Sequence, residues 1–385
     1  MAAVVSLCIL LLVASLLAVA DCELCATPAS KQGECVEINK CEAILDLYNN
    51  LTSLDKQTIK FLHNSQCGYA GLNPKVCCPK NDKPFVLQRP IVPFLGNRFG
   101  ENEEEKIAKG QCGIQYTTDR IFDGTITEID EFPWMALLIY QTEQGPGLAC
   151  GGVLINSKYV LTAAHCVIGA QVEKLGKLIA VRLGEYDLQT AVDCDDISDE
   201  IEEYCAPPPV DVFIESSHPH PDYKTGTADR HHDIALIRLS NPVNYTKYIQ
   251  PICLPNATHD SSISESKSEL VICGWGKTEK SEGSAIKLKA KVPLVQENEC
   301  KNPYEAKGIR LAKTQLCAGD GKHDSCKGDS GGPLMLEDLS DPAENRWYAV
   351  GIISFGSNPC AKQGVPAVYT RVLPYLEWIK STMKP

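Results

Sequence analysis

Three segments of the chain carry side chains that together could cleave an acyl bond. Ser330 lies among small residues in Gly-Asp-Ser-Gly-Gly-Pro (328–333), which let the backbone turn sharply and let a substrate approach. A serine hydroxyl needs a base, and His165, in Thr-Ala-Ala-His-Cys (162–166), is the candidate because an imidazole titrates near neutral pH. Asp233 opens an apolar run, where an unpartnered carboxylate would be costly. The three contexts predict a serine nucleophile, a histidine base and an aspartate that orients the base.

The elements that must position these residues are short strands. Turn residues separate brief apolar and β-branched runs, a rhythm that predicts an all-β sandwich or barrel. Examples of these runs are residues 136–140, 152–155, 159–161, 234–239 and 349–354. Only the tail, residues 374–383, has the apolar spacing of a helix.

Size and charge narrow the class of protein. The 385 residues and 44% hydrophobic content allow one large core plus a smaller unit. A net charge of -12 argues against nucleic-acid partners and anionic membranes, because both would repel the chain.

The first 20 residues are almost wholly apolar and end in Ala-Val-Ala, which predicts a secretory signal peptide over 1–20. The alternative, a membrane anchor, is disfavoured because Asp21 follows at once. Removing Cys8 with the signal leaves 18 of the 19 cysteines, an even number that fits disulfides in an exported chain. Glycosylation sequons occur at Asn50, Asn244 and Asn256.

The amino-terminal region is dense in cysteine. A stretch this short cannot bury a large apolar core, so it needs disulfide bonds for stability, and six cysteines can pair in 15 ways. These cysteines are Cys25, Cys35, Cys41, Cys67, Cys77 and Cys78, of which the last two must bond to different partners. Prolines and a charged run then predict a linker over 80–120.

The segments TAAHC, DIAL and GDSGGP resemble the trypsin and chymotrypsin family, and the resemblance spans nearly all of residues 121–385. It implies two six-stranded antiparallel β-barrels with a C-terminal helix and with His165, Asp233 and Ser330 in the cleft between the barrels. It also implies an oxyanion hole formed by the backbone N–H groups of Gly328 and Ser330. Each such donor is typically worth about 3 kcal/mol.

The same resemblance implies a pocket for basic side chains. Asp324 lies where trypsin-like members place the carboxylate at the pocket base, which predicts cleavage after Arg or Lys. Gly356 matches a small residue of the pocket wall, whereas Ala367 stands where the family usually has a second glycine. The backbone of Ser354 to Gly356 is expected to receive the substrate as an added antiparallel strand.

Activation by cleavage is implied by the junction between Arg120 and Ile121, which resembles the activation site of trypsin-like zymogens. The alternative is an ordinary basic-apolar junction. After cleavage the new Ile121 amine would pair with Asp329 and order the pocket. The activator would itself be a trypsin-like protease, because it must cut after arginine.

The amino-terminal cysteines resemble a CLIP domain, the regulatory module of arthropod extracellular proteases, here assigned to residues 21–79. The two resemblances together imply the following pairs: Cys25–Cys77, Cys35–Cys67, Cys41–Cys78, Cys112–Cys253, Cys150–Cys166, Cys194–Cys205, Cys300–Cys317 and Cys326–Cys360. Cys22 and Cys273 remain unassigned, either bonded to each other or as two free thiols.

An acidic loop offers oxygen ligands at Glu185, Asp187, Thr190 and Asp193, a set that suits calcium. Related CLIP proteases hold calcium at a similar place. The alternative is a solvated acidic loop.

The prediction is therefore a secreted serine endopeptidase zymogen that needs no cofactor for catalysis. It would work in hemolymph-like fluid, activate a zymogen such as prophenoloxidase or a cytokine precursor in melanization or Toll signalling, and be inhibited by a serpin. A non-catalytic cofactor of the same fold is disfavoured because Ser330 is intact. A digestive protease fits poorly with a CLIP module and linker.

Overall fold

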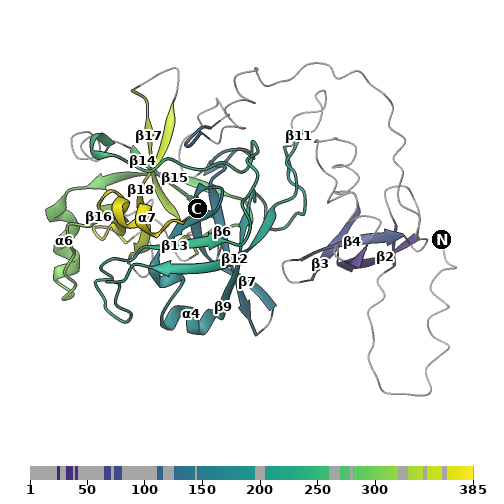
Figure 1. Cartoon of the computed structure of the whole chain (residues 1–385), viewed down its shortest axis with the longest axis horizontal. Coiled ribbons are helices and arrows are strands. Elements are labelled where there is room, and N and C mark those ends of the chain that lie inside the picture. Colours follow the sequence, from purple (N-terminus) through teal and green to yellow (C-terminus); the bar gives the residue numbers. More distant parts are fainter. Residues whose placement is uncertain are drawn as a thin grey trace. The chain divides into compact units, whose positions relative to one another are not determined.

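The structure is a computed structural model of the whole chain (Figure 1). It describes residues 24–26, 32–37, 40–41, 65–70, 73–79, 111–115, 125–143, 145–195, 204–259, 269–277, 281, 283–319, 328–340, 345–357 and 362–384. The chain divides into two compact units, of which the larger holds both barrels.

The smaller unit is a disulfide-stapled sheet. Its four antiparallel strands have the order β1-β2-β4-β3, with bounds β1 Leu24–Ala26, β2 Gln32–Glu37, β3 Gln66–Ala70 and β4 Asn73–Pro79. Three disulfides join Cys25 to Cys77, Cys35 to Cys67 and Cys41 to Cys78. The buried residues described here are mainly cysteines and Val76, so covalent bonds replace a large apolar core.

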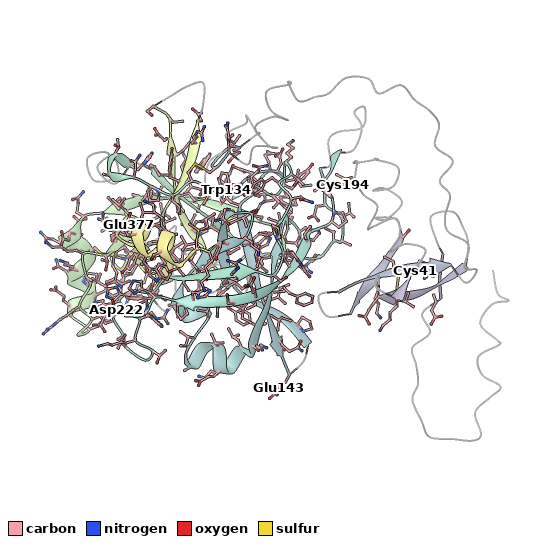
Figure 2. All side chains as sticks on the ribbon, viewed as in Figure 1. Cys41, Trp134, Glu143, Cys194, Asp222 and Glu377 are labelled. Carbon is pink, nitrogen blue, oxygen red and sulfur yellow. A yellow bond between two sulfur atoms is a disulfide. The ribbon has the colours of Figure 1, made fainter. Side chains whose placement is uncertain are left out.

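The first barrel of the larger unit is closed by six antiparallel strands in the order β12-β13-β8-β7-β6-β9. Their bounds are β6 Met135–Thr142, β7 Gly145–Asn156, β8 Tyr159–Thr162, β9 Lys177–Leu183, β12 Val210–Pro219 and β13 Ala235–Leu239. Every residue of β8 and β13 is buried, which explains why both sequences are mostly apolar, with Thr162 and Arg238 as the exceptions. Trp134 lies in the core of this unit (Figure 2).

The second barrel has the order β14-β17-β18-β19-β16-β15, and the pairing of β14 with β15 closes it. The short strand β5 (Thr125–Ile126) adds to β15 at the edge. The bounds are β14 Glu269–Gly274, β15 Leu288–Val295, β16 Gln315–Ala318, β17 Pro333–Asp338, β18 Arg346–Phe355 and β19 Ala367–Arg371. The predicted pair of six-stranded antiparallel barrels is thus confirmed.

The carboxyl-terminal helix is also confirmed, as a 3₁₀ turn η3 (Leu373–Tyr375) followed by α7 (Leu376–Thr382). The expectation that only the tail is helical was wrong. The structure adds α4 (Ala170–Leu175), α6 (Glu297–Glu305) and the 3₁₀ turn η2 (Ala164–Cys166). Helix α6 buries only Cys300 and Tyr304, so it has too few apolar positions to produce a periodic signal.

Four further disulfides lie in the described part of the larger unit, and each joins a pair implied by the family resemblance. They are Cys112–Cys253, Cys150–Cys166, Cys194–Cys205 and Cys300–Cys317. The Cys194–Cys205 bond links the two-residue strands β10 (Cys194–Asp195) and β11 (Tyr204–Cys205). Among the described cysteines, Cys273 is a free and buried thiol. The predicted partners Cys326 and Cys360, and the unassigned Cys22, lie outside the described residues.

Candidate active site

His165 and Asp233 form a buried pair at the end of the first barrel. His165 lies in η2, directly after β8, and Asp233 comes two residues before β13, which pairs with β8. The His165 Nδ1 atom lies 2.8 Å from Asp233 Oδ2, and the His165 backbone N–H donates to Oδ1 over 2.9 Å. The carboxylate therefore fixes both the ring and the backbone of the histidine.

The second barrel contributes the other partners of Asp233. The Ser354 hydroxyl of β18 donates to Asp233 Oδ2, and the Thr370 hydroxyl of β19 donates to the Asp233 carbonyl over 2.9 Å. Burial alone would raise the pKa of Asp233, but the charge and hydrogen bonds of His165, with the Ser354 hydroxyl, hold that pKa below its ordinary value. Asp233 therefore stays ionised at neutral pH.

Ser330 lies in the turn that precedes β17, where the two barrels meet. The Ser330 carbonyl accepts a 2.8 Å hydrogen bond from the Gly151 N–H of the first barrel. Gly331 has φ +83°, and a Cβ there would come within 2.2 Å of the Thr162 hydroxyl oxygen, so the turn requires glycine. Among the described residues, neither Gly328 N–H nor Ser330 N–H donates to a backbone carbonyl, which leaves both suited to an oxyanion.

The Asp329 carboxylate lies against the end of β14 and the residues that follow it. Its Oδ1 accepts a 2.7 Å hydrogen bond from Gly276 N–H. A Cβ at Gly274 or Gly276 would come within 2.3 Å of the Asp329 carboxylate, so the absence of side chains there makes room for it. Arg120 and Ile121, the predicted cleavage junction, lie outside the described residues.

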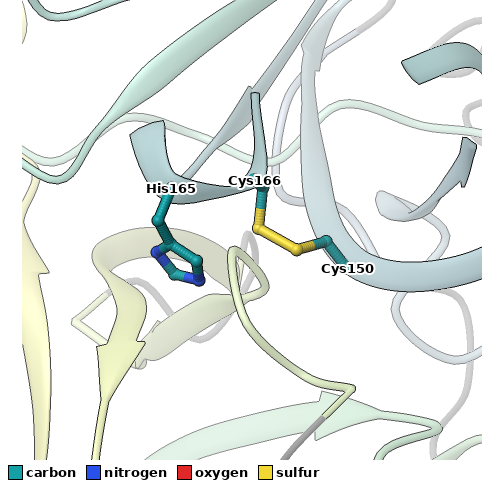
Figure 3. A group of neighbouring side chains, drawn as sticks. All are labelled: Cys150, His165 and Cys166. Carbon is teal, nitrogen blue, oxygen red and sulfur yellow. A yellow bond between two sulfur atoms is a disulfide. The ribbon is translucent and has the colours of Figure 1, made fainter. Parts of the chain in front are cut away.

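The side chains of Cys150, His165 and Cys166 gather into a group with the spacing of metal ligands (Figure 3). The two sulfur atoms are bonded to each other, however, so neither is a thiolate that could bind a metal. The bond instead ties η2 to β7 and holds the segment that carries His165.

The predicted substrate pocket is described in part. Ser354 ends the buried part of β18, Gly356 follows that strand, and Ala367 begins β19 and is fully buried. The neighbouring strands β18 and β19 thus bring these three residues to one region. Asp324, the predicted base of the pocket, lies outside the described residues.

Two histidines adjacent to Asp233 could have competed with His165 for the role of base. His231 Nε2 lies 2.7 Å from the Arg310 carbonyl, and His232 Nδ1 lies 3.0 Å from the Tyr375 hydroxyl. Both rings therefore have partners other than Asp233.

The residues predicted to bind calcium lie together. Glu185 and Asp193 are buried, and Asp193 accepts hydrogen bonds from the Thr190 hydroxyl and from Asp187 N–H. Burial, with the charge of Asp193, raises the pKa of Glu185 to about 8 even though Arg182 pairs with it. Burial raises the pKa of Asp193 as well.

Of the predicted glycosylation sites, Asn244 and Asn256 are exposed, and Asn50 lies outside the described residues.

Sequence reasoning missed three contacts at the site: the Ser354 hydroxyl on Asp233, the Thr370 hydroxyl on the Asp233 carbonyl, and Arg230. The Arg230 Nη1 atom donates to the Ser354 carbonyl over 2.7 Å, and its guanidinium carbon lies 5.8 Å from the centre of the Phe355 ring. In each of these hydrogen bonds the donor and the acceptor lie more than a hundred residues apart in the sequence, so no local motif could predict the contact.

Two closed barrels with a buried His–Asp pair beside a serine in a glycine turn define a serine protease of the trypsin type. Residues 121–379 match the trypsin family, and residues 25–78 match the regulatory CLIP domain of proteinases. The chain belongs to the trypsin family and carries a CLIP domain; it is a serine endopeptidase.

Similar proteins match the chain over nearly its whole length. The chain is 39% identical to phenoloxidase-activating enzyme 1 of Spodoptera litura, over 93% of each chain. It is 40% identical to phenoloxidase-activating factor 1 of Holotrichia diomphalia, over 94% of this chain and 93% of that one. The crystal structure of the Drosophila Grass clip serine protease of the Toll pathway is similar, with a TM-score of 0.62 and 30% identity over 94% of this chain and 97% of that one.

Proposed function

We propose that the chain is a secreted zymogen, cut after Arg120, that cleaves proteins after Arg or Lys and so activates a downstream precursor in an insect immune cascade. The observation that carries the proposal is the buried His165–Asp233 pair beside Ser330. Similarity to a phenoloxidase-activating enzyme, to a phenoloxidase-activating factor and to a clip serine protease of the Toll pathway supports melanization or Toll signalling as the setting. Within the described residues, no helix has the length and apolarity needed to cross a membrane.

In the proposed mechanism, Ser330 attacks the scissile carbonyl while His165 takes the hydroxyl proton. The His165 Nε2 atom is buried and has no hydrogen-bond partner among the described residues, so it is available for that proton. Asp233 on the opposite nitrogen fixes the tautomer and stabilises the imidazolium that forms. The N–H groups of Gly328 and Ser330 would stabilise the developing oxyanion, and no cofactor enters the reaction.

Specificity for Arg and Lys rests on Asp324, with Ser354, Gly356 and Ala367 as the other pocket residues. We expect Asp324→Ser to reduce the preference for arginyl over phenylalanyl substrates by about a hundredfold, because a buried carboxylate pairs only with a cationic side chain. The measurement is kcat/KM for matched arginyl and phenylalanyl peptides, with Asp338→Ser as a control that removes an equal charge from the far end of β17. A wild-type enzyme that favours phenylalanine would contradict the assignment.

Arg230 occupies the edge on which the substrate strand would bind. Its guanidinium donates a hydrogen bond to the Ser354 carbonyl, which would otherwise accept a hydrogen bond from the substrate backbone. We expect Arg230→Ala to lower KM for arginyl peptides about fivefold with little change in kcat, because a competing charged hydrogen bond worth roughly 1 kcal/mol is removed. Arg310→Ala is the matched control, since it removes an exposed arginine from the same neighbourhood. An unchanged or raised KM for Arg230→Ala would show that Arg230 does not compete with substrate.

We also propose that Glu185, Asp187, Thr190 and Asp193 hold a structural calcium ion. All four offer oxygen ligands, and the two buried carboxylates have raised pKa values that a nearby cation would lower. The ion would stabilise the loop closed by Cys194 and Cys205 and would take no part in the reaction.

The partners of the proposed function are an upstream trypsin-like activator, a protein substrate and an inhibitory serpin. The experiment that identifies the substrate incubates the activated enzyme with candidate zymogens, including prophenoloxidase and a cytokine precursor, and sequences the new amino termini. The proposal requires one new terminus that directly follows Arg or Lys. Cleavage at many sites in every candidate would indicate a digestive enzyme instead.

A further inference from the structure

A second cluster of metal-ligating side chains lies on the first barrel, outside the residues assigned to catalysis. His220, Asp222 and His232 each offer one ligand atom, and these three atoms all lie within 4.8 Å of one another. His220 directly follows β12, and His232 directly precedes Asp233. The His220 N–H donates to the Ile234 carbonyl over 2.9 Å, so the backbone holds the two segments together.

His220 and Asp222 lie close enough for one small cation to bring together. His220 Nδ1 lies 4.0 Å from Asp222 Oδ2. A tetrahedral zinc ion binds imidazole nitrogen and carboxylate oxygen at about 2.0–2.2 Å and so holds two such ligands about 3.4 Å apart, a separation that a small rotation of the exposed Asp222 side chain would reach. The Asp222 backbone N–H donates to His220 Nδ1 over 3.3 Å, which requires the lone pair of that nitrogen to face Asp222. A metal ion also needs this nitrogen without its proton, and it would take the place of the Asp222 N–H on the lone pair.

The third ligand is held by groups around it. The His232 ring stacks on the His220 ring, with centroids 5.1 Å apart and planes 12° apart. The Tyr375 hydroxyl, 3.0 Å from His232 Nδ1, can accept that N–H and so leave Nε2 with its lone pair. A hydrogen bond to the second ring nitrogen is the usual way in which proteins orient a metal-binding histidine. Tyr375 and Trp378 also pack edge-on or tilted against His220, which fixes that ring.

The cluster is open to solvent on one side. The Asp222 side chain is 72% exposed, whereas that of His220 is 11% exposed. Asp222 also lies at the periphery of the larger unit (Figure 2). An ion could therefore enter past Asp222 and keep a water molecule as its fourth ligand.

We propose that His220, Asp222 and His232 form a binding site for a divalent transition-metal ion, with Zn²⁺ as the matching ion. Two imidazoles and one carboxylate form a ligand set that suits zinc and not calcium or magnesium, which prefer oxygen. The site is distinct from the acidic loop of Glu185 and Asp193, which offers only oxygen atoms. It is independent of the proposed substrate specificity.

The test is calorimetric titration of the full chain with ZnCl₂ at neutral pH. The Ser330→Ala background prevents self-cleavage, and any histidine tag is removed beforehand. We expect one equivalent of Zn²⁺ to bind, with affinity at least about tenfold weaker in Asp222→Ala and in His232→Ala. The matched control is His218→Ala, which removes a histidine of β12 outside the cluster and is expected to bind Zn²⁺ like the parent chain.

X-ray absorption of the zinc-loaded chain gives a second readout, with two imidazole ligands expected. Because the Asp222 side chain is exposed, the Asp222→Ala variant is expected to fold even where His232→Ala does not. Absence of Zn²⁺ binding, or binding of undiminished affinity in Asp222→Ala and His232→Ala, would overturn the proposal and leave the stacked histidines as a packing contact between the barrel and α7.

Discussion

Replacement of Ser330 or His165 by alanine in the activated enzyme is expected to lower kcat about 10⁶-fold, and replacement of Asp233 somewhat less. Either loss stops the same proton transfer, so the double variant Ser330→Ala/His165→Ala is expected to be hardly worse than each single variant. The reason for the smaller effect of Asp233 is that it acts through His165, on which its carboxylate makes two hydrogen bonds. The measurement is steady-state hydrolysis of an arginyl ester for all variants, together with single-turnover acylation for the variants that keep Ser330.

His231→Ala is the matched control for the base. It removes a histidine two residues from Asp233 whose ring hydrogen-bonds with the Arg310 carbonyl. Acylation is expected to persist in this variant. A loss comparable to that of His165→Ala would mean that the base has been assigned wrongly, and additive losses in the double variant would mean that the residues do not act as one unit.

The sequence sufficed for those features that short motifs or covalent chemistry determine. The apolar runs named from the sequence coincide with β6, β7, β8 and β13 of the first barrel and with β18 of the second, because buried strands such as β8 and β13 consist mostly of apolar residues. The cysteine positions, read through the family resemblance, matched all seven disulfides of the described residues. The segment around Ser330 was recognisable because its turn requires glycine at 331.

Other features depend on contacts that sequence alone does not reveal. The Ser354 hydroxyl reaches Asp233 only because the second barrel packs against the first. The position of Arg230 over the Ser354 carbonyl depends equally on that packing. The sequence did not predict the polar helix α6, because its two buried side chains are too few to give a periodic pattern of apolar residues. The motifs therefore predict which residues form the site, whereas the packing of one barrel against the other determines the hydrogen bonds that the Ser354 hydroxyl and Arg230 make there.

Cleavage after Arg120 is the second large effect that we expect. In an Arg120→Gln variant treated with a trypsin-like activator, kcat/KM for an arginyl ester is expected to stay about 10⁴-fold below that of the cut wild type. The expected physical reason is that Asp329 lies between Gly328 and Ser330, so that a change in the position of its side chain would turn both proposed oxyanion donors. Loss of each donor costs about 10²-fold or more in kcat. The new Ile121 amine is the proposed partner that draws the Asp329 carboxylate into its active position.

Two variants separate this explanation from a general loss of folding. Arg120→Lys keeps a cleavable basic residue and is expected to become fully active, whereas Asp329→Asn is expected to be cut normally and remain inactive, because the neutral amide cannot pair with the amine. After cutting, a non-reducing gel is expected to show one species, since the Cys112–Cys253 disulfide ties the segment before the junction to the protease domain. Reduction would then release two chains. If uncut Arg120→Gln hydrolysed arginyl esters as fast as the cut wild type, the active site would already be ordered in the intact chain, and control of this enzyme would have to act on substrate access and not on the oxyanion hole.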